Sequence, residues 1–79
     1  MNYDLAIMAL EGLARAPMTV RVEGADVVVE GSEASFKELA RLCLLLGGAQ
    51  SSEDAFELQP AVHVTKTSKG LKLRVVQLS

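Results

Sequence analysis

Hydrophobic side chains recur at helical spacing near the start of the chain and predict a helix that runs to about Ala16. Asn2 or Asp4 is a suitable N-terminal cap, and Pro17 ends the segment. One side of this helix carries Leu5, Met8, Ala9, Gly12, Leu13 and Ala16. The other side carries Ile7, Leu10 and Ala14. Because both sides are apolar, we expect the helix to pack on two sides, either within its own chain or against a second chain.

Apolar and polar residues alternate in the stretch MTVRVEGADVVVEG and predict a β-hairpin from Met18 to Gly31. A loop at Gly24-Ala25 sets the strand register. On one face, this register gathers Val20, Val22, Val27 and Val29. The other face carries Thr19, Arg21, Val28 and Glu30. A shift of one residue would scatter the apolar face, so the alternation and the turn agree on this pairing.

The stretch SFKELARLCLLLGG predicts a second helix, with Ser32 as N-cap and Glu33 in the first turn. Gly47 or Gly48 is expected to end it as a left-handed cap. At 100° per residue the apolar side collects Phe36, Leu39, Ala40, Cys43 and Leu46, with Leu42 and Leu44 at its margins. Leu45 falls among the charged residues on the opposite side.

The stretch AVHVTKTSKGLKLRVVQL predicts a second hairpin. A turn at Ser68-Lys69 would pair Val64 with Leu73, which places His63 opposite Arg74. The segments together predict a single α+β domain over residues 1–79, in the order α-β-β-α-β-β. We expect one four-stranded antiparallel sheet made of the two hairpins, with both helices on one face.

Composition refines this picture. The 79 residues are 49% hydrophobic but only 4% aromatic, so the core should be aliphatic. A single cysteine allows no intrachain disulfide and fits a reducing compartment, so we expect a cytoplasmic protein. The first residues lack the positive charge of a signal peptide, because Asp4 precedes the first cation, Arg15. The apolar run near residues 42–46 is far shorter than the ~20 residues that span a bilayer.

Charge is distributed unevenly. The net charge is −2, yet residues 58–79 contain Lys66, Lys69, Lys72 and Arg74 and no acidic residue. The predicted sheet would gather a basic face for an acidic protein partner, made of Arg21, His63, Lys72 and Arg74. The alternative is a nucleic acid or another anionic ligand. An acidic chain without stacking aromatics on its strands makes nucleic acid the weaker hypothesis.

Catalytic chemistry is not indicated by any motif. His63 is the only histidine, and a neighbouring Arg74 would disfavour its protonated form. Cys43 lies in the predicted apolar arc, where a free thiol behaves as a small hydrophobic group. We therefore expect a non-enzymatic protein without metal or cofactor.

Three apolar helix residues are left over from the predicted core, namely Ile7, Leu10 and Leu45. Exposed apolar residues that form a patch usually mark an interface. We therefore expect a homodimer, most simply a two-fold one, and a purely structural dimer is one possible role.

The segment from Val27 through Val75 resembles the small immunity proteins of bacterial polymorphic toxin systems. The resemblance lies in VVVEGSEASFKELARLCLLL, in VHV at Val62 to Val64, and in the closing LKLRVV. It leaves out the N-terminal helix. It implies a cytoplasmic, non-enzymatic protein that binds and blocks a toxin, and it transfers no individual binding residue.

Overall fold

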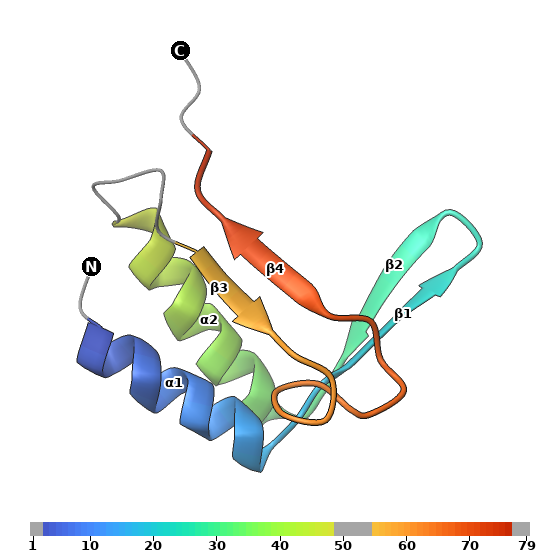
Figure 1. Cartoon of the computed structure of the whole chain (residues 1–79), viewed down its shortest axis with the longest axis horizontal. Helices are drawn as coiled ribbons and strands as arrows, with labels where there is room; N and C mark the ends of the chain where they lie inside the picture. The colour runs from blue at the N-terminus through green and yellow to red at the C-terminus, as the bar shows by residue number, and fades with distance from the viewer. Residues whose placement is uncertain (1–2, 49–54, 77–79) are drawn as a thin grey trace.

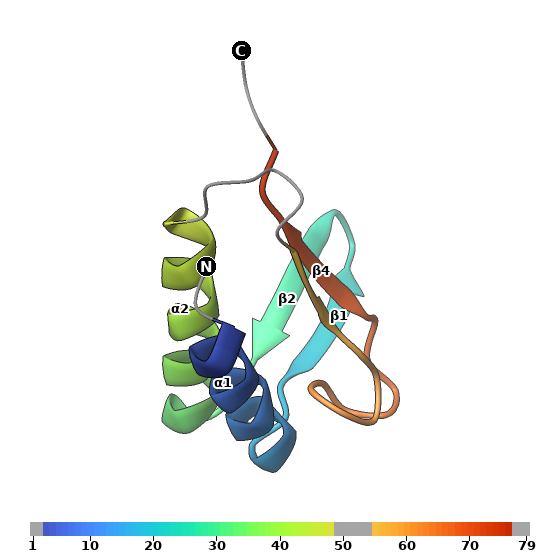
Figure 2. The ribbon, with the colours of Figure 1, turned by 60° about the vertical axis from the view of Figure 1, so that its left-hand side comes forward.

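The computed structural model describes residues 3–48 and 55–76. Its elements follow the order α1 (Tyr3–Arg15), β1 (Thr19–Glu23), β2 (Asp26–Glu30), α2 (Glu33–Gly47), β3 (Ala55–Leu58) and β4 (Leu71–Arg74). The two helices lie side by side in one layer and the strands form the other (Figures 1 and 2). This confirms the α+β class and the element order. Asn2, one of the two expected caps, lies outside the described residues.

The first hairpin has the predicted register. Val20 pairs with Val29, and Val22 pairs with Val27. The turn uses Gly24 at φ +59, a backbone conformation that favours glycine. Val20 is buried, but Val22 and Val27 at the far end of the hairpin are exposed. The apolar face therefore extends past the part that the helices cover.

The single four-stranded sheet was a wrong prediction. The structure has two separate two-stranded antiparallel sheets, β1-β2 and β3-β4. In the second sheet, Phe56 pairs with Leu73 and Leu58 pairs with Leu71. Leu73 therefore does not pair with Val64, and His63 does not lie opposite Arg74. The strand that partners β4 comes from the segment before Pro60 and not from the segment after it.

A tight turn in residues 59–64 explains this difference. The backbone N–H groups of Val62, His63 and Val64 all donate to the carbonyl oxygen of Gln59. Pro60 has no N–H to donate to a β-ladder, and Ala61 has a left-handed φ of 66°. A strand cannot continue through such a turn. The alternation around His63 reflects the burial of Val64, which forms isolated bridges with Met18 and Pro60 and does not pair with β4.

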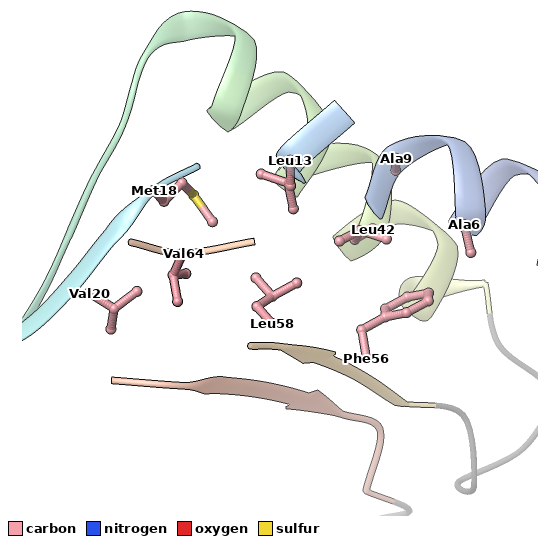
Figure 3. Packing of buried hydrophobic residues seen from close by; sticks show 9 residues of the cluster. All are labelled: Ala6, Ala9, Leu13, Met18, Val20, Leu42, Phe56, Leu58 and Val64. Atoms are coloured by element: carbon pink, nitrogen blue, oxygen red, sulfur yellow. The ribbon is translucent and has the colours of Figure 1, made fainter. Parts of the chain in front are cut away.

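The core lies between the helix layer and the strands (Figure 3). It is aliphatic apart from Phe56, as the composition predicts. Its buried apolar members are Ala6, Ala9, Leu13, Met18, Val20, Leu42, Phe56, Leu58 and Val64. Every element except β2 and β4 contributes at least one of these residues. Met18 comes from the connection before β1, and Val64 comes from the connection between β3 and β4. The core therefore depends on long-range contacts between both hairpins and both helices.

Helix α1 packs against α2 and the core of its own chain. It buries Ala6, Ala9 and Leu13, whereas Leu5 and Met8 on the predicted face are exposed. The small residues allow α2 to come close. A Cβ atom at Gly12 would lie only 2.7 Å from the Glu38 side chain of α2.

Helix α2 is also rotated from its predicted orientation, by about one residue position, or ~100°. It buries Leu42 and Ser35, and Leu45 packs partly against the core. Cys43, predicted to be in the core, is exposed, as is Phe36. The apolar pattern alone could not fix the rotation, because leucines or alanines occur on several sides of this helix.

Ser35 sets the orientation of α2 through hydrogen bonds. Its Oγ donates to the carbonyl oxygen of Ala16 at 2.6 Å, which links the start of α2 to the end of α1. Its backbone N–H donates to Ser32 Oγ at 3.2 Å, and the backbone N–H of Ser32 donates back to Ser35 Oγ at 3.3 Å. Ser32 is the predicted N-cap, in a capping box that uses serine in place of glutamate. At the other end Gly48 has φ −98, so the predicted left-handed cap is wrong.

Replacing Ser32 with alanine should lower the free energy of unfolding by about 1 kcal/mol. The change removes the acceptor of the Ser35 N–H and loosens the serine pair that connects the two helices. Urea denaturation followed by circular dichroism would measure the loss. Ser32→Asn retains a capping acceptor and should stay close to wild type. Equal stability of all three proteins would show that the cap contributes nothing.

Candidate functional site

An open apolar groove runs between α1 and α2, and we call it the helix groove. Its volume is about 520 Å³. It is lined by Leu5, Met8 and Ala9 from α1 and by Arg41, Leu44 and Leu45 from α2. Ala9 is buried and Leu45 is half-buried, whereas Leu5, Met8 and Leu44 keep 51%, 63% and 76% of their surface exposed. The groove is thus a solvent-accessible continuation of the apolar contact between the two helices.

Helical periodicity explains why these six residues lie together. Each helix contributes three positions spaced i, i+3 and i+4, which lie next to one another on a helix surface. The helices run antiparallel, because Ala16 at the end of α1 contacts Ser35 at the start of α2. The N-terminal half of α1 therefore lies beside the C-terminal half of α2, and the two triplets meet.

Charged side chains flank the groove on both helices. On α1, Asp4 and Glu11 flank Met8 at helical spacing, and both are exposed. On α2, Lys37 and Arg41 are one turn apart, and Arg41 is one turn before Leu44. Arg41 forms an ion pair with Glu38 of its own helix but keeps 64% of its side chain exposed. Arg15 of α1 is one turn after Glu11, and Glu33 of α2 is one turn before Lys37, so each rim carries charges of both signs.

The predicted oligomer patch is not brought together. Leu10 and Leu45 both pack partly against the core. Ile7 is exposed on α1 and does not line the groove. Only Leu45 belongs to the helix groove. The sequence did carry a signal for the site, namely more apolar helix positions than a single core can bury, but it did not show which ones would stay outside.

The four predicted basic residues do not share a sheet face. Arg21 lies on β1, Lys72 and Arg74 lie on β4, and His63 lies in the connection between β3 and β4. Arg21 is also neutralised, because its Nη2 is 2.9 Å from Glu23 Oε1 and its Nη1 pairs with Glu30.

The outer face of the second sheet has a smaller hollow of about 220 Å³. It is lined by Ala55, Phe56, Glu57, Lys72 and Arg74. Glu57 lies directly opposite Lys72 in the strand pairing. An acidic residue in the middle of this face makes it a poor surface for polyanions.

His63 has a structural role in its loop. Its Nδ1 accepts a hydrogen bond from the backbone N–H of Gln59 at 3.1 Å, so the ring helps to close the turn. Partial burial lowers the pKa of His63 below its ordinary value of 6.5, because desolvation disfavours the charged imidazolium. Protonation would also remove the acceptor that holds the Gln59 N–H.

Stability should therefore fall as the pH drops below about 6.5. The unfolded chain takes up its proton at the ordinary pKa, before the folded protein does, so acid favours unfolding. The stabilisation by neutral His63 is fully present above the pKa of the unfolded chain. It is lost as the pH falls toward the lowered pKa of His63 in the folded protein. His63→Asn keeps an acceptor but does not titrate. Between about pH 7.5 and 5.5, its melting temperature should therefore fall less than that of the wild type. Parallel profiles for the two proteins would contradict this.

Cys43 is exposed and forms no disulfide. In residues 3–48 and 55–76, no three histidine, cysteine, aspartate or glutamate side chains gather as they would to hold a metal ion. Neither of the two described helices is long and apolar enough to cross a membrane.

These features define a small two-layer α+β domain with an apolar groove on its helix pair. Comparison with family models, with curated protein sequences and with solved structures finds no match. The geometry of the helix groove is therefore the basis for a functional proposal.

Proposed function

We propose that this chain is a protein-interaction module that binds its partner through the helix groove. The observation that carries the proposal is the exposure of Leu5, Met8 and Leu44 along one continuous groove. Contiguous apolar surface on a small domain usually marks an interface. Isolated exposed leucines would not carry this argument, because they are common on protein surfaces.

The chemistry of the lining favours a protein over a small molecule. Sites for small ligands combine apolar walls with several convergent polar groups that fix the ligand's orientation. Among the described residues, Arg41 is the single polar side chain that lines the groove. An apolar helix face laid along the groove needs no such set of polar groups, and docking of this kind is a common mode of protein recognition. Burying the three exposed side chains would contribute about 1.5–3 kcal/mol each at most.

A blocking role, of the kind implied by the resemblance to immunity proteins, would be one form of this function. The module would act by occupying a partner's surface, and no catalytic residue would be required. The proposal itself is the wider one: the helix groove is the contact surface, whichever protein is bound.

Leu44→Asp tests the proposal, because it introduces a charge at the most exposed apolar position of the groove. The side chain points to solvent, so the fold should survive. Val22→Asp is a matched control, since Val22 is also exposed but lies on the first hairpin, away from the groove. Wild type and Val22→Asp should form the same complex, with themselves or with a protein of their own cells. Leu44→Asp should bind more than about a hundredfold more weakly, because an aspartate would be buried without a partner.

The measurements are light scattering for self-association and affinity capture followed by mass spectrometry for other partners. Circular dichroism spectra of the three proteins would establish that each is folded. If the wild type neither self-associates nor captures a protein in a Leu44-dependent way, the proposal fails.

A further inference from the structure

The turn of residues 59–64 is closed by an imidazole ring. The backbone N–H of Gln59 donates to His63 Nδ1 at 3.1 Å, and the backbone N–H of His63 donates back to the Gln59 carbonyl oxygen at 3.0 Å. That carbonyl oxygen also accepts the N–H groups of Val62 and Val64. The ring nitrogen can accept its hydrogen bond only while it carries no proton, so the closed turn requires a neutral His63.

The same turn contains a strained backbone position. Ala61 has φ 66°, in the left-handed region that a residue with a Cβ atom rarely adopts. Such a conformation persists only where the surrounding contacts hold it in place. In this turn those contacts are the hydrogen bonds that involve Gln59 and the burial of Val64. The loss of one of these hydrogen bonds would therefore favour a relaxed conformation of Ala61.

The turn also anchors the connection between α1 and β1. The backbone N–H of Met18 donates to the carbonyl oxygen of His63 at 3.2 Å, and that of Thr65 donates to the Met18 carbonyl oxygen at 2.8 Å. Val64 forms an isolated bridge with Met18, and both side chains are fully buried. No residue in the range 59–64 belongs to a helix or to one of the two sheets, so the turn can open without breaking either.

We propose that this turn is a pH-sensitive clasp, in which protonation of His63 opens residues 59–64 and releases Val64 from Met18 while the helices and both sheets stay folded. In the closed turn, a proton on Nδ1 would face the N–H of Gln59, and two donors cannot bond to each other. The open turn has no such conflict and takes up the proton more readily, so acid shifts the population toward the open form. The clasp lies outside the helix groove and does not depend on the proposed function.

The charges around the turn do not oppose this direction. Partial burial disfavours the imidazolium and lowers the pKa of His63. The charged residues on the segments that adjoin the turn or bond to it are Glu57, Arg15, Arg21, Lys66 and Lys69. Glu57 lies opposite Lys72 in the second sheet, and Arg21 is paired within its own hairpin. Among residues 3–48 and 55–76, no carboxylate forms an ion pair with the ring that would hold the imidazolium in the closed turn.

Native-state hydrogen exchange followed by NMR tests the clasp at about pH 7.5 and about pH 5.5, with urea added below the unfolding transition. The amides of Met18, Val64 and Thr65 report on the turn, because each donates a hydrogen bond that opening would break. Their protection factors should fall severalfold at the lower pH, with little dependence on urea, because local opening exposes little surface. The amide of Leu42 in α2 reports global unfolding, so its exchange should be slower and should depend strongly on urea.

The control is His63→Asn, which keeps an acceptor but does not titrate, so its turn amides should have nearly the same protection factors at both pH values. Turn amides that exchange as slowly as Leu42, with the same urea dependence, would report global unfolding alone and overturn the clasp. An equal loss of protection in the wild type and in His63→Asn would exclude His63 as the trigger. Titration of the wild-type ring by NMR needs no variant, and a pKa at or above 6.5 in the folded protein overturns the proposal.

Discussion

Leu42→Ala should lower the free energy of unfolding by about 2–5 kcal/mol, the largest effect that we expect from a single truncation in this protein. Leu42 is fully buried and lies between α1 and the strands (Figure 3). Alanine would leave a cavity that is too constrained to collapse, because α1, α2 and β3 all line the core. A domain of this size has roughly 3–5 kcal/mol of net stability, so much of the population should unfold. Urea denaturation followed by circular dichroism would measure the change.

Cys43→Ala is the matched control for this prediction. It lies one position further along the same helix, but its side chain is exposed. Its effect should stay within about 0.5 kcal/mol, as for most surface substitutions. The apolar pattern of the sequence predicts a different ranking, with Cys43 at the centre of the buried arc. A large loss for Cys43→Ala and a small one for Leu42→Ala would therefore show that α2 has the rotation predicted from sequence.

Ser68→Ala should cost about 1–3 kcal/mol, the penalty for leaving a buried donor without a partner. Ser68 is buried in the connection before β4, and its Oγ accepts the backbone N–H of Val20 in β1 at 3.0 Å. The next residue, Lys69, donates its backbone N–H to the carbonyl oxygen of Val20. These two bonds connect the first sheet to the second, although no ladder joins them. Alanine would leave the Val20 N–H without its acceptor.

The control is Thr67→Ala, at an exposed neighbouring position. It should leave the denaturation midpoint nearly unchanged. Hydrogen exchange gives a local readout, because the Val20 amide should lose protection in Ser68→Ala before the rest of β1 does. Unchanged protection at Val20 would mean that the serine does not hold the two sheets together.

The first hairpin shows how much local sequence can determine. The turn glycine at position 24 and the alternation on each side of it agree on a single register, and the structure has that register. The extents of the helices and the serine cap of α2 were also predictable, because caps and breakers act within a few residues. These features depend on neighbours along the chain.

The second hairpin shows where local reasoning ends. Both AFEL and VHVT alternate, and either could have paired with LKLR. The chain pairs β3 with β4 and folds the other segment into a turn, in which Val64 lies against Met18 in an isolated bridge. That choice rests on burying Leu58, Val64 and Met18 in the same core. Competition between two similar strands is decided by long-range packing, which a periodic pattern does not encode.

The candidate site likewise depends partly on local sequence and partly on contacts between distant segments. The sequence by itself determined the α+β class, the element order, the first hairpin and the surplus of apolar positions on the helices. Only the tertiary structure decided which of those positions stay outside the core, because the rotation of each helix is fixed by its neighbours. The contact between Ser35 and Ala16, and the close approach at Gly12, turn Leu42 inward and leave Leu44 in the groove. An apolar side chain is equally apolar in either place, so only contacts between distant segments can assign it to the core or to the groove.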